Sequence, residues 1–189
     1  MGNKPSIKEA LLTAAIDLFI KHGFDQVTIN QICKEVDVTK TAFYYYYKSK
    51  DELIIDFFLS DNPISNEDLM SIFSAQDYAN QVLKLMEIHI KHIVRAGYQL
   101  TKEFYRVTLR NEMLAPAPEQ SVVGNIIITL IQRAQEAGQI KNMAPAKDIH
   151  RTLCYISNGV SLFWSMSNGD FDVMEESRNR FKNLLMLDS

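Results

Sequence analysis

The chain has 189 residues, 47 % of them hydrophobic, which suffices for one ordinary packed domain and a smaller one. The net charge of −3 at pH 7 argues against a broadly basic nucleic-acid-binding coat. Its two cysteines, Cys33 and Cys154, form no C-x-x-C pair, and its apolar runs are too short for a membrane span or secretion signal. We therefore expect a cytoplasmic protein with no membrane segment.

Capping patterns predict two helices in the first part of the chain. Ser6-x-x-Glu9 is a capping box at the start of an apolar face of period 3.6, and the helix ends near Gly23. Thr28-x-x-Gln31 is a second box, and its short helix ends at Asp37, because Asp tolerates the left-handed conformation of a tight turn.

The run from Thr39 to Lys50 predicts a third helix and the start of a fourth. Thr39 is the expected cap, and Phe43 and Tyr47, four residues apart, are the expected inward positions. Ser49-x-x-Glu52 is a third capping box, which opens the fourth helix. Two short helices joined by a tight turn are typical of a helix-turn-helix DNA-binding motif.

The same run carries the only local excess of positive charge in the first 57 residues, with three lysines and no acidic residue. It also contains four consecutive tyrosines. The alternative to DNA binding is an aromatic core helix with a solvated charged face. A helix cannot bury four adjacent residues unless it is surrounded, and each tyrosine hydroxyl needs a partner, so DNA binding is favoured.

At these positions the chain resembles the amino-terminal domain of the tetracycline-repressor (TetR) family of bacterial transcription regulators. The resemblance covers about 50 residues without gaps. The matching segments are Ala14-Ala15-x-x-Leu18-Phe19-x-x-x-Gly23-Phe24, Thr28-Ile29-x-x-Ile32, and Val38 to Leu53 apart from Tyr45. Departures from the family pattern are Asp37 in place of Gly, Cys33 in place of Ala, and Thr41-Ala42 in place of Gly-Thr.

The resemblance implies which residues contact DNA. Those expected at the phosphate backbone are Thr28, Thr39, Tyr44, Tyr46 and Lys50. Those expected to reach base edges are Asn30, Lys40, Thr41 and Tyr45. Asp37 adds a negative charge near this face, and we expect it to weaken non-specific binding.

The remaining residues predict a second, helical domain. Asp61–Ser65 is a turn-rich linker, so we expect a helix-turn-helix domain over 1–60 and a larger helical domain over 61–189. Two further caps are predicted at Ser65-x-x-Asp68, for a short helix, and at Ser74-x-x-Asp77, for a long helix ending near Gly97. Further helices are expected over 98–113, 119–137, 146–168 and 171–186, with a rigid break at Ala115–Pro118. With no strand pattern, the expected fold class is all-α.

The helix expected over 146–168 is apolar around more than half of its circumference, so it needs neighbours on two sides. One neighbour is its own domain, and the other is expected to be the same helix of a second subunit, since readers of paired half-sites dimerise. A central core helix of a monomer is the alternative.

A ligand pocket is implied by the family and only hinted at by the residues. Polar and aromatic side chains on the apolar central helices suit an apolar pocket with a few orienting groups, and His89 is expected on an inward face. The candidates are His89, Tyr105, Asn125, Tyr155 and Asn158. For each, the alternative is a core residue whose polar group is hydrogen-bonded within the protein. His89 and His92 lack a third metal ligand, so no metal and no cofactor are expected.

Together these features predict a homodimeric regulator that binds double-stranded operator DNA, a repressor released by an unknown small-molecule effector. Two alternatives stay open. One is a protein-interaction adaptor with a helix-turn-helix, and the other is a small-molecule enzyme with a vestigial one. The sequence shows no catalytic constellation, so no enzymatic activity is expected.

Overall fold

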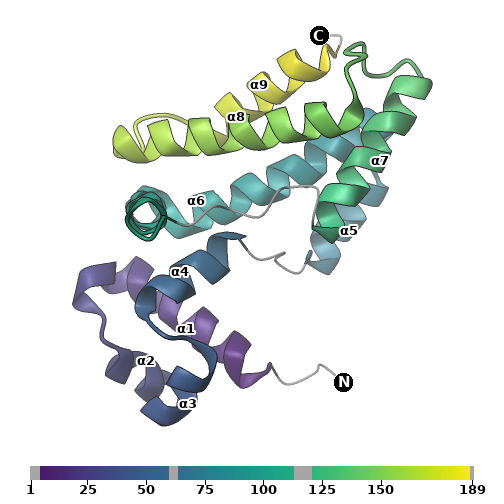
Figure 1. The fold of residues 1–189 in the computed structure, drawn as a ribbon. Coiled ribbons are helices and arrows are strands. Elements are labelled where there is room, and N and C mark those ends of the chain that lie inside the picture. The colour runs from purple at the N-terminus through teal and green to yellow at the C-terminus, as the bar shows by residue number, and fades with distance from the viewer. Residues whose placement is uncertain (1–4, 60–63, 113–120, 188–189) are drawn as a thin grey trace. The chain divides into compact units, whose positions relative to one another are not determined.

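The computed structural model describes residues 5–59, 64–112 and 121–187, and all regular structure within these ranges is helical (Figure 1). The all-α prediction is therefore confirmed. The elements are α1 (Ile7–His22), the short 3₁₀ helix η1 (Phe24–Gln26), α2 (Ile29–Val36), α3 (Lys40–Tyr46), α4 (Lys50–Leu59), α5 (Asn66–Phe73), α6 (Tyr78–Arg110), α7 (Val122–Glu136), α8 (Ala146–Met166) and α9 (Val173–Leu185).

The chain forms two compact units, one comprising residues 1–60 with 96–114 and the other residues 61–95 with 115–189. Helix α6 contributes to both, and it is broken at Gly97, whose φ of 77° and ψ of 161° are not helical. The predicted end of one helix near Gly97 and start of another at 98 therefore correspond to a real break. A positive φ at this position favours glycine because it has no Cβ.

The first unit is built on one apolar core shared by α1 to α4. The largest fully buried side chains in it are Phe43, Leu11, Ile16, Ile32, Leu53 and Ile54. Phe104 of α6 joins this core, and its ring stacks on that of Phe58 with 4.5 Å between centroids. Burial of the inner face of α3 leaves its opposite face to solvent, which is the arrangement that a DNA-reading helix needs.

The second unit is organised around α8, which packs against α7 and most extensively against α9 (Figure 1). Ile149 and Leu153 of α8 and Phe181 of α9 are buried in this core. A buried carboxylate, Glu87 of α6, accepts a hydrogen bond of 2.7 Å from Arg178 Nε of α9. This pairing satisfies a charge that would otherwise be costly to bury.

Four predicted helix starts are confirmed. Capping boxes are present at Ser6 and Thr28, and the hydroxyls of Thr39 and Ser65 cap α3 and α5. In each case the hydroxyl oxygen accepts a hydrogen bond from a first-turn backbone N–H, a contact that depends only on residues three positions apart.

Two predicted caps are wrong in detail. Helix α6 begins at Tyr78 rather than after Ser74, and its cap is Asp77, whose Oδ1 accepts from the Asn80 backbone N–H at 2.8 Å. At the start of α4, Glu52 accepts from the backbone N–H of Lys48 at 2.6 Å rather than from Ser49. The predicted break at Ala115–Pro118 and most of the linker at Asp61–Ser65 lie outside the described residues.

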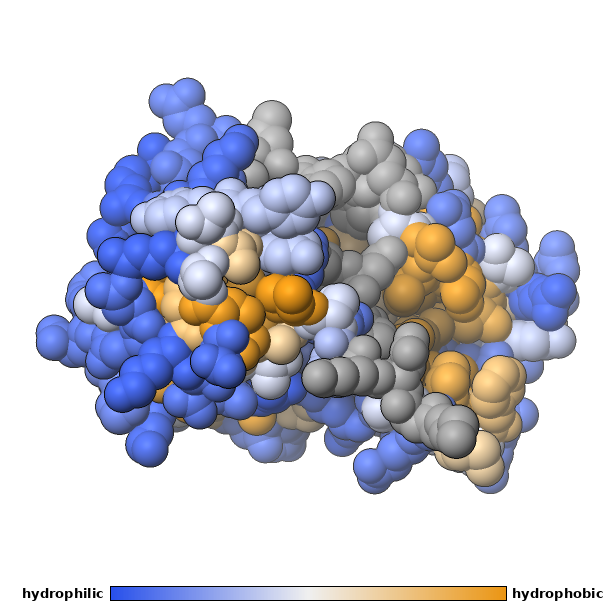
Figure 2. All heavy atoms as spheres, turned by 90° about the horizontal axis from the view of Figure 1, so that it is seen from below, coloured by the Kyte–Doolittle hydropathy of each residue, from blue (hydrophilic) through white to orange (hydrophobic). Residues whose placement is uncertain are grey.

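Across the described ranges, no helix combines the length and the apolar character that crossing a membrane requires. The face seen from below in Figure 2 is largely hydrophilic, with hydrophobic residues gathered in a few groups.

Candidate nucleic-acid interface

A tight turn joins α2 to α3 in the first unit. Asp37 adopts the left-handed conformation, with φ 57° and ψ 49°, and its backbone N–H donates to the carbonyl groups at the end of α2. The backbone N–H of Val38 also donates to the carbonyl of Cys33, at 2.9 Å. Thr39 then caps α3, so the turn between the two helices is only three residues long. The predicted helix–turn–helix geometry is confirmed.

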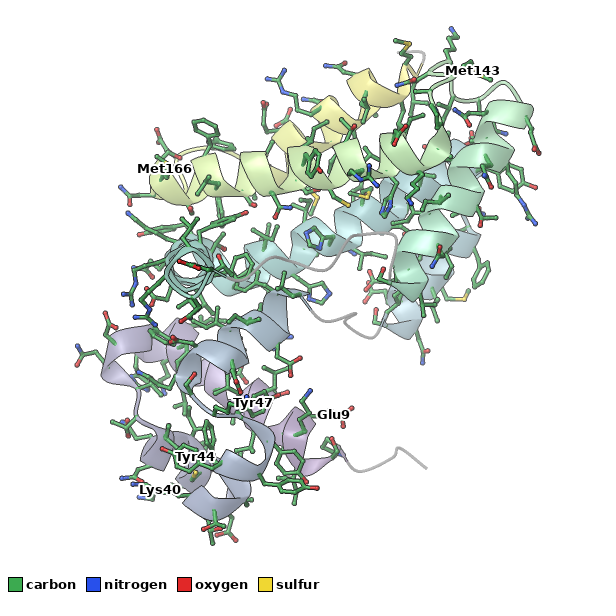
Figure 3. All side chains as sticks on the ribbon, in the orientation of Figure 1. Glu9, Lys40, Tyr44, Tyr47, Met143 and Met166 are labelled. Carbon is green, nitrogen blue, oxygen red and sulfur yellow. The ribbon has the colours of Figure 1, made fainter. Side chains whose placement is uncertain are left out.

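As predicted, Phe43 of α3 and Tyr47, which directly follows the helix, lie in the core. Phe43 and Tyr47 are buried, whereas Tyr44 and Tyr45 expose 53 % and 81 % of their surface. Lys40 and Thr41 are exposed in the first turn of the helix. Figure 3 shows Lys40 and Tyr44 on α3 and Tyr47 on the side that faces α1.

Tyr46, expected at the phosphate backbone, is half-buried, and its ring meets that of Tyr45 edge to face with 4.8 Å between centroids. Asn30 and Thr39 are exposed at the starts of α2 and α3. The exposed set therefore combines an ammonium, hydroxyls and an amide, which are the donors that proteins use on phosphates and base edges.

The donors of Thr28 are already engaged within the α2 cap. Its backbone N–H and its hydroxyl both donate to Gln31 Oε1, at 2.7 and 2.8 Å. A phosphate that contacts Thr28 must therefore replace this oxygen. Gln31 was not among the predicted contact residues. The Thr28-x-x-Gln31 pattern could have predicted it, because a capping box places the Gln31 side chain at the first turn of α2.

Lys50 is the predicted contact whose environment differs most from expectation. Its ammonium donates to the backbone carbonyls of Phe24 at 2.8 Å and Val27 at 2.6 Å, and it lies 4.4 Å from the centroid of the Phe24 ring. Two of the three ammonium N–H groups are thus used within the protein. No local pattern indicated these contacts, because they join residues 23 and 26 positions apart.

The five predicted ligand-binding residues are divided between the two units. Tyr105 lies beside Phe104 in the first unit, with 5.2 Å between ring centroids, and the other four belong to the second. Asn125 and Asn158 are exposed, and each side-chain amide donates to a carbonyl four residues earlier in its own helix. Tyr155 is also exposed.

The inward orientation expected for His89 is wrong, since its side chain is exposed. Desolvation by the surrounding protein nevertheless lowers the pKa of its imidazole to about 4.

A cavity of about 480 Å³ is present in the first unit, and none of the five predicted ligand-binding residues lines it. It lies between the end of α1 and α6, and its lining includes Phe24, Gly23, Gln99 and Glu103. Among the described residues, no group of three or more His, Cys, Asp or Glu side chains is arranged to hold a metal ion.

Two short helices are joined by a turn with a left-handed residue, and the second helix presents an ammonium and several hydroxyls to solvent from the core of the first unit. This geometry defines a helix-turn-helix DNA-binding protein. Residues 11–57 match the family model described as bacterial regulatory proteins, tetR family, so this part of the chain is similar to the DNA-binding domain of those transcriptional regulators.

Curated relatives are similar over nearly the whole chain. The probable acrEF/envCD operon repressor of Escherichia coli is 21 % identical, with 95 % of this chain and 86 % of that protein covered. IcaR of Staphylococcus aureus, a negative transcriptional regulator of the biofilm operon icaADBC, is 24 % identical, with 94 % of each chain covered.

Among solved structures, the chain is similar to FadR of Thermus thermophilus, a TetR-family transcriptional repressor in complex with lauroyl-CoA. The TM-score is 0.68 at 19 % identity, and 96 % of each chain is covered. At this identity the likeness concerns the fold, which extends through both units.

Proposed function

We propose that this protein is a homodimeric repressor that binds operator DNA through α2 and α3 and is released by a small-molecule effector. The observation that carries the proposal is the exposed polar face of α3, held outward by the burial of Phe43 and Tyr47. The repressors of Escherichia coli and Staphylococcus aureus support the direction of regulation. The proposal includes no enzymatic activity.

The proposed contacts divide by chemistry. Lys40 and Thr41 lie in the first turn of α3, where helix-turn-helix proteins reach base edges in the major groove, and Asn30 and Tyr45 are assigned to the same task. Tyr44, Tyr46, Thr28 and Thr39 are assigned to phosphates. In domain terms, residues 1–60 are the proposed DNA-binding domain and 61–189 the ligand-binding and dimerisation domain, with the second part of α6 packed in the former.

The DNA-binding proposal is tested by selecting duplexes from a random library with the full chain and measuring affinity over a salt series. Loss of the Tyr44 hydroxyl in Tyr44→Phe should weaken binding to selected and unrelated duplexes alike, because a phosphate contact carries no sequence information. Lys40→Ala should instead change the preferred sequence, by roughly 1–3 kcal/mol at one base pair. A chain that enriches no duplex contradicts the proposal.

The exposed face of α8 supports dimerisation. Tyr155 and Phe163 expose 65 % and 68 % of their surface, and Met166, at the end of the helix, is also exposed (Figure 3). Large apolar side chains gathered on one helix of a soluble protein mark an interaction surface. A second copy of α8 and α9 is the proposed occupant, because a two-fold pair of reading helices fits paired half-sites one helical turn apart, ~34 Å.

Sedimentation of the natural chain and of Phe163→Glu tests this surface. The natural chain should sediment as a dimer at micromolar concentration, and the variant should shift toward the monomer, since it places a charge in an apolar contact. Leu109→Glu is the matched control, because Leu109 is also a largely exposed apolar residue but lies on α6. A monomeric natural chain, alone and on DNA, contradicts the proposal.

Release by an effector requires a coupling free energy between the ligand site and DNA, equal in both directions. Lauroyl-CoA, the ligand of the Thermus protein, is the first probe, and a thermal-shift screen of other small molecules follows. Each ligand found should bind more weakly in the presence of saturating operator. A ligand whose affinity is the same with and without operator contradicts the proposed release.

A further inference from the structure

Lys50 is the first residue of α4, yet its ammonium lies against the backbone that precedes α2. It donates to the carbonyl of Val27 at 2.6 Å and to that of Phe24 at 2.8 Å. The ring of Phe24 lies 4.4 Å away, at a distance typical of a cation–π contact. The side chain therefore ties the start of α4 to the segment between α1 and α2.

The Val27 carbonyl and the Thr28 N–H belong to one peptide group. Lys50 binds the carbonyl end of this group, and Gln31 Oε1 accepts from the N–H end at 2.7 Å. The side chain of Val27 is itself buried in the core of the unit. The plane of this peptide is consequently held from both ends and from one side.

An ammonium on a peptide carbonyl also polarises the group, which makes its N–H a stronger hydrogen-bond donor. This N–H stands at the start of α2, on the helix that leads into the turn before α3. The contact therefore affects both the direction and the strength of a donor on the proposed DNA-binding face.

We propose that Lys50 is a positioning residue for DNA binding, which acts by orienting the Val27–Thr28 peptide and not as an independent phosphate ligand. The inference rests on the proposed function, since it assigns how one residue of that interface works. It predicts that the Lys50 ammonium stays bound to the two carbonyls and contacts no phosphate. Lys50 therefore contributes no released counterion when DNA binds.

The salt dependence of duplex binding separates the two roles. A lysine that neutralises one phosphate contributes about 0.9 to the slope of log K against log salt concentration. For Lys50→Met we expect affinity to fall by about tenfold on every duplex, with the slope unchanged. Lys48→Met, which removes an exposed ammonium from the same segment, is the matched control for the loss of one charge.

A charge-preserving variant keeps the test decisive if Lys50→Met folds poorly. In Lys50→Arg the planar guanidinium cannot replace the compact ammonium between two carbonyls, so we expect several-fold weaker binding with the full salt slope. A direct phosphate contact predicts undiminished binding instead, because arginine binds phosphate at least as well as lysine.

A double-mutant cycle with Gln31→Ala then tests the route of the effect, because Gln31 holds the other end of the same peptide. If Lys50 acts through this peptide, the losses in affinity of the two single variants are not additive. Folding of each variant is checked by circular dichroism at the temperature of the binding measurement.

Unchanged affinity in Lys50→Met, a slope lower by about 0.9, or additive losses in the cycle would each overturn the positioning role. Failure of the natural chain to bind any duplex is a different outcome, and it would remove the proposed function itself.

Discussion

The hydroxyl of Tyr47 donates a hydrogen bond of 2.6 Å to Asp56 Oδ2, and Lys8 Nζ lies 3.0 Å from the same oxygen. Three elements meet in these contacts, because Lys8 belongs to α1, Tyr47 follows α3 and Asp56 belongs to α4. Burial and the neighbouring Asp56 carboxylate raise the pKa of Tyr47 above its ordinary value of 10.0. The end of the reading helix is thus anchored by a polar contact as well as by the apolar core.

Removing the Tyr47 hydroxyl should therefore destabilise the first unit. We expect Tyr47→Phe to lower the free energy of unfolding by about 1–2 kcal/mol, because Asp56 loses a hydrogen bond in a half-buried site. Urea unfolding measures the change, and Tyr45→Phe, which alters an exposed ring, should leave stability unchanged.

A folded-state pKa above the unfolded value also means that the contribution of Tyr47 is present below pH 10.0 and is lost as the pH rises further. The Phe variant should lack this alkaline loss.

Gln31→Glu should keep the α2 cap and weaken DNA binding. A carboxylate can accept the same two hydrogen bonds, as Glu9 does from the N–H and hydroxyl of Ser6 at 2.7 and 3.0 Å. Negative charge in the first turn also favours the helix, so stability should be maintained or increased by up to about 1 kcal/mol. The same charge repels phosphate, and we expect affinity for all duplexes to fall by about tenfold. Fluorescence anisotropy measures the affinity, and Gln132→Glu on α7 controls for net charge. Equal affinities of the two variants would argue against a role of this helix start in DNA binding.

Asp37 is expected to lower both the stability of the fold and the affinity for DNA, and the two effects can be measured separately. Its φ of 57° lies in the left-handed region, where glycine has no steric penalty, so Asp37→Gly should stabilise the fold by about 0.5–1 kcal/mol. Removal of the carboxylate should also strengthen non-specific DNA binding. Asp37→Asn isolates the second effect, because asparagine tolerates this conformation and carries no charge. Thermal unfolding and duplex titrations of both variants check the prediction, which fails if Asn leaves the DNA affinity unchanged.

Stability of the second unit should decline in acid through Asp68. The ammonium of Lys91, at 2.7 Å, and the hydroxyl of Ser65, also at 2.7 Å, hold the pKa of this carboxyl below its ordinary value of 3.8. A depressed folded-state pKa means that the contribution is present above pH 3.8 and is lost as the pH falls through the lower folded value. Unfolding measured from pH 5 downward should therefore show a shallower acid loss in Asp68→Asn than in the natural chain. Asp170→Asn, at an exposed position after α8, should behave like the natural chain.

The sequence by itself determined the features that depend on residues a few positions apart. The caps at Ser6, Thr28 and Thr39 and the turn at Asp37 each follow from a side chain and a backbone group within one helical turn, and all were predicted correctly. The inward position of Phe43 follows from helical period, whereas Tyr47, also predicted inward, is buried just after the end of α3 in an extended conformation. These local rules sufficed for the fold class and for the DNA-reading motif.

The sequence did not determine which residue caps α6. Ser74 and Asp77 are both good caps, and tertiary packing selects between them. The helix starts after Asp77 because the next two backbone N–H groups, those of Tyr78 and Ala79, donate to the side-chain oxygen of Gln139, at 3.0 and 3.3 Å. Gln139 is about sixty positions away in the sequence, so no local pattern predicts this contact.

Only the tertiary structure decided what Lys50 touches and where the second part of α6 packs. A lysine in a basic run is expected to face solvent or phosphate, but two backbone carbonyls 23 and 26 positions away accept hydrogen bonds from its ammonium instead. Similarly, the part of α6 that follows Arg95 lies beyond the predicted linker and yet packs with α1 to α4, through contacts such as Phe58 on Phe104. The physical reason is the same in both cases. Caps and periodicity are set by energies within one turn of helix, whereas these contacts depend on which distant surfaces bury most apolar area and satisfy each other's polar groups once the chain has folded.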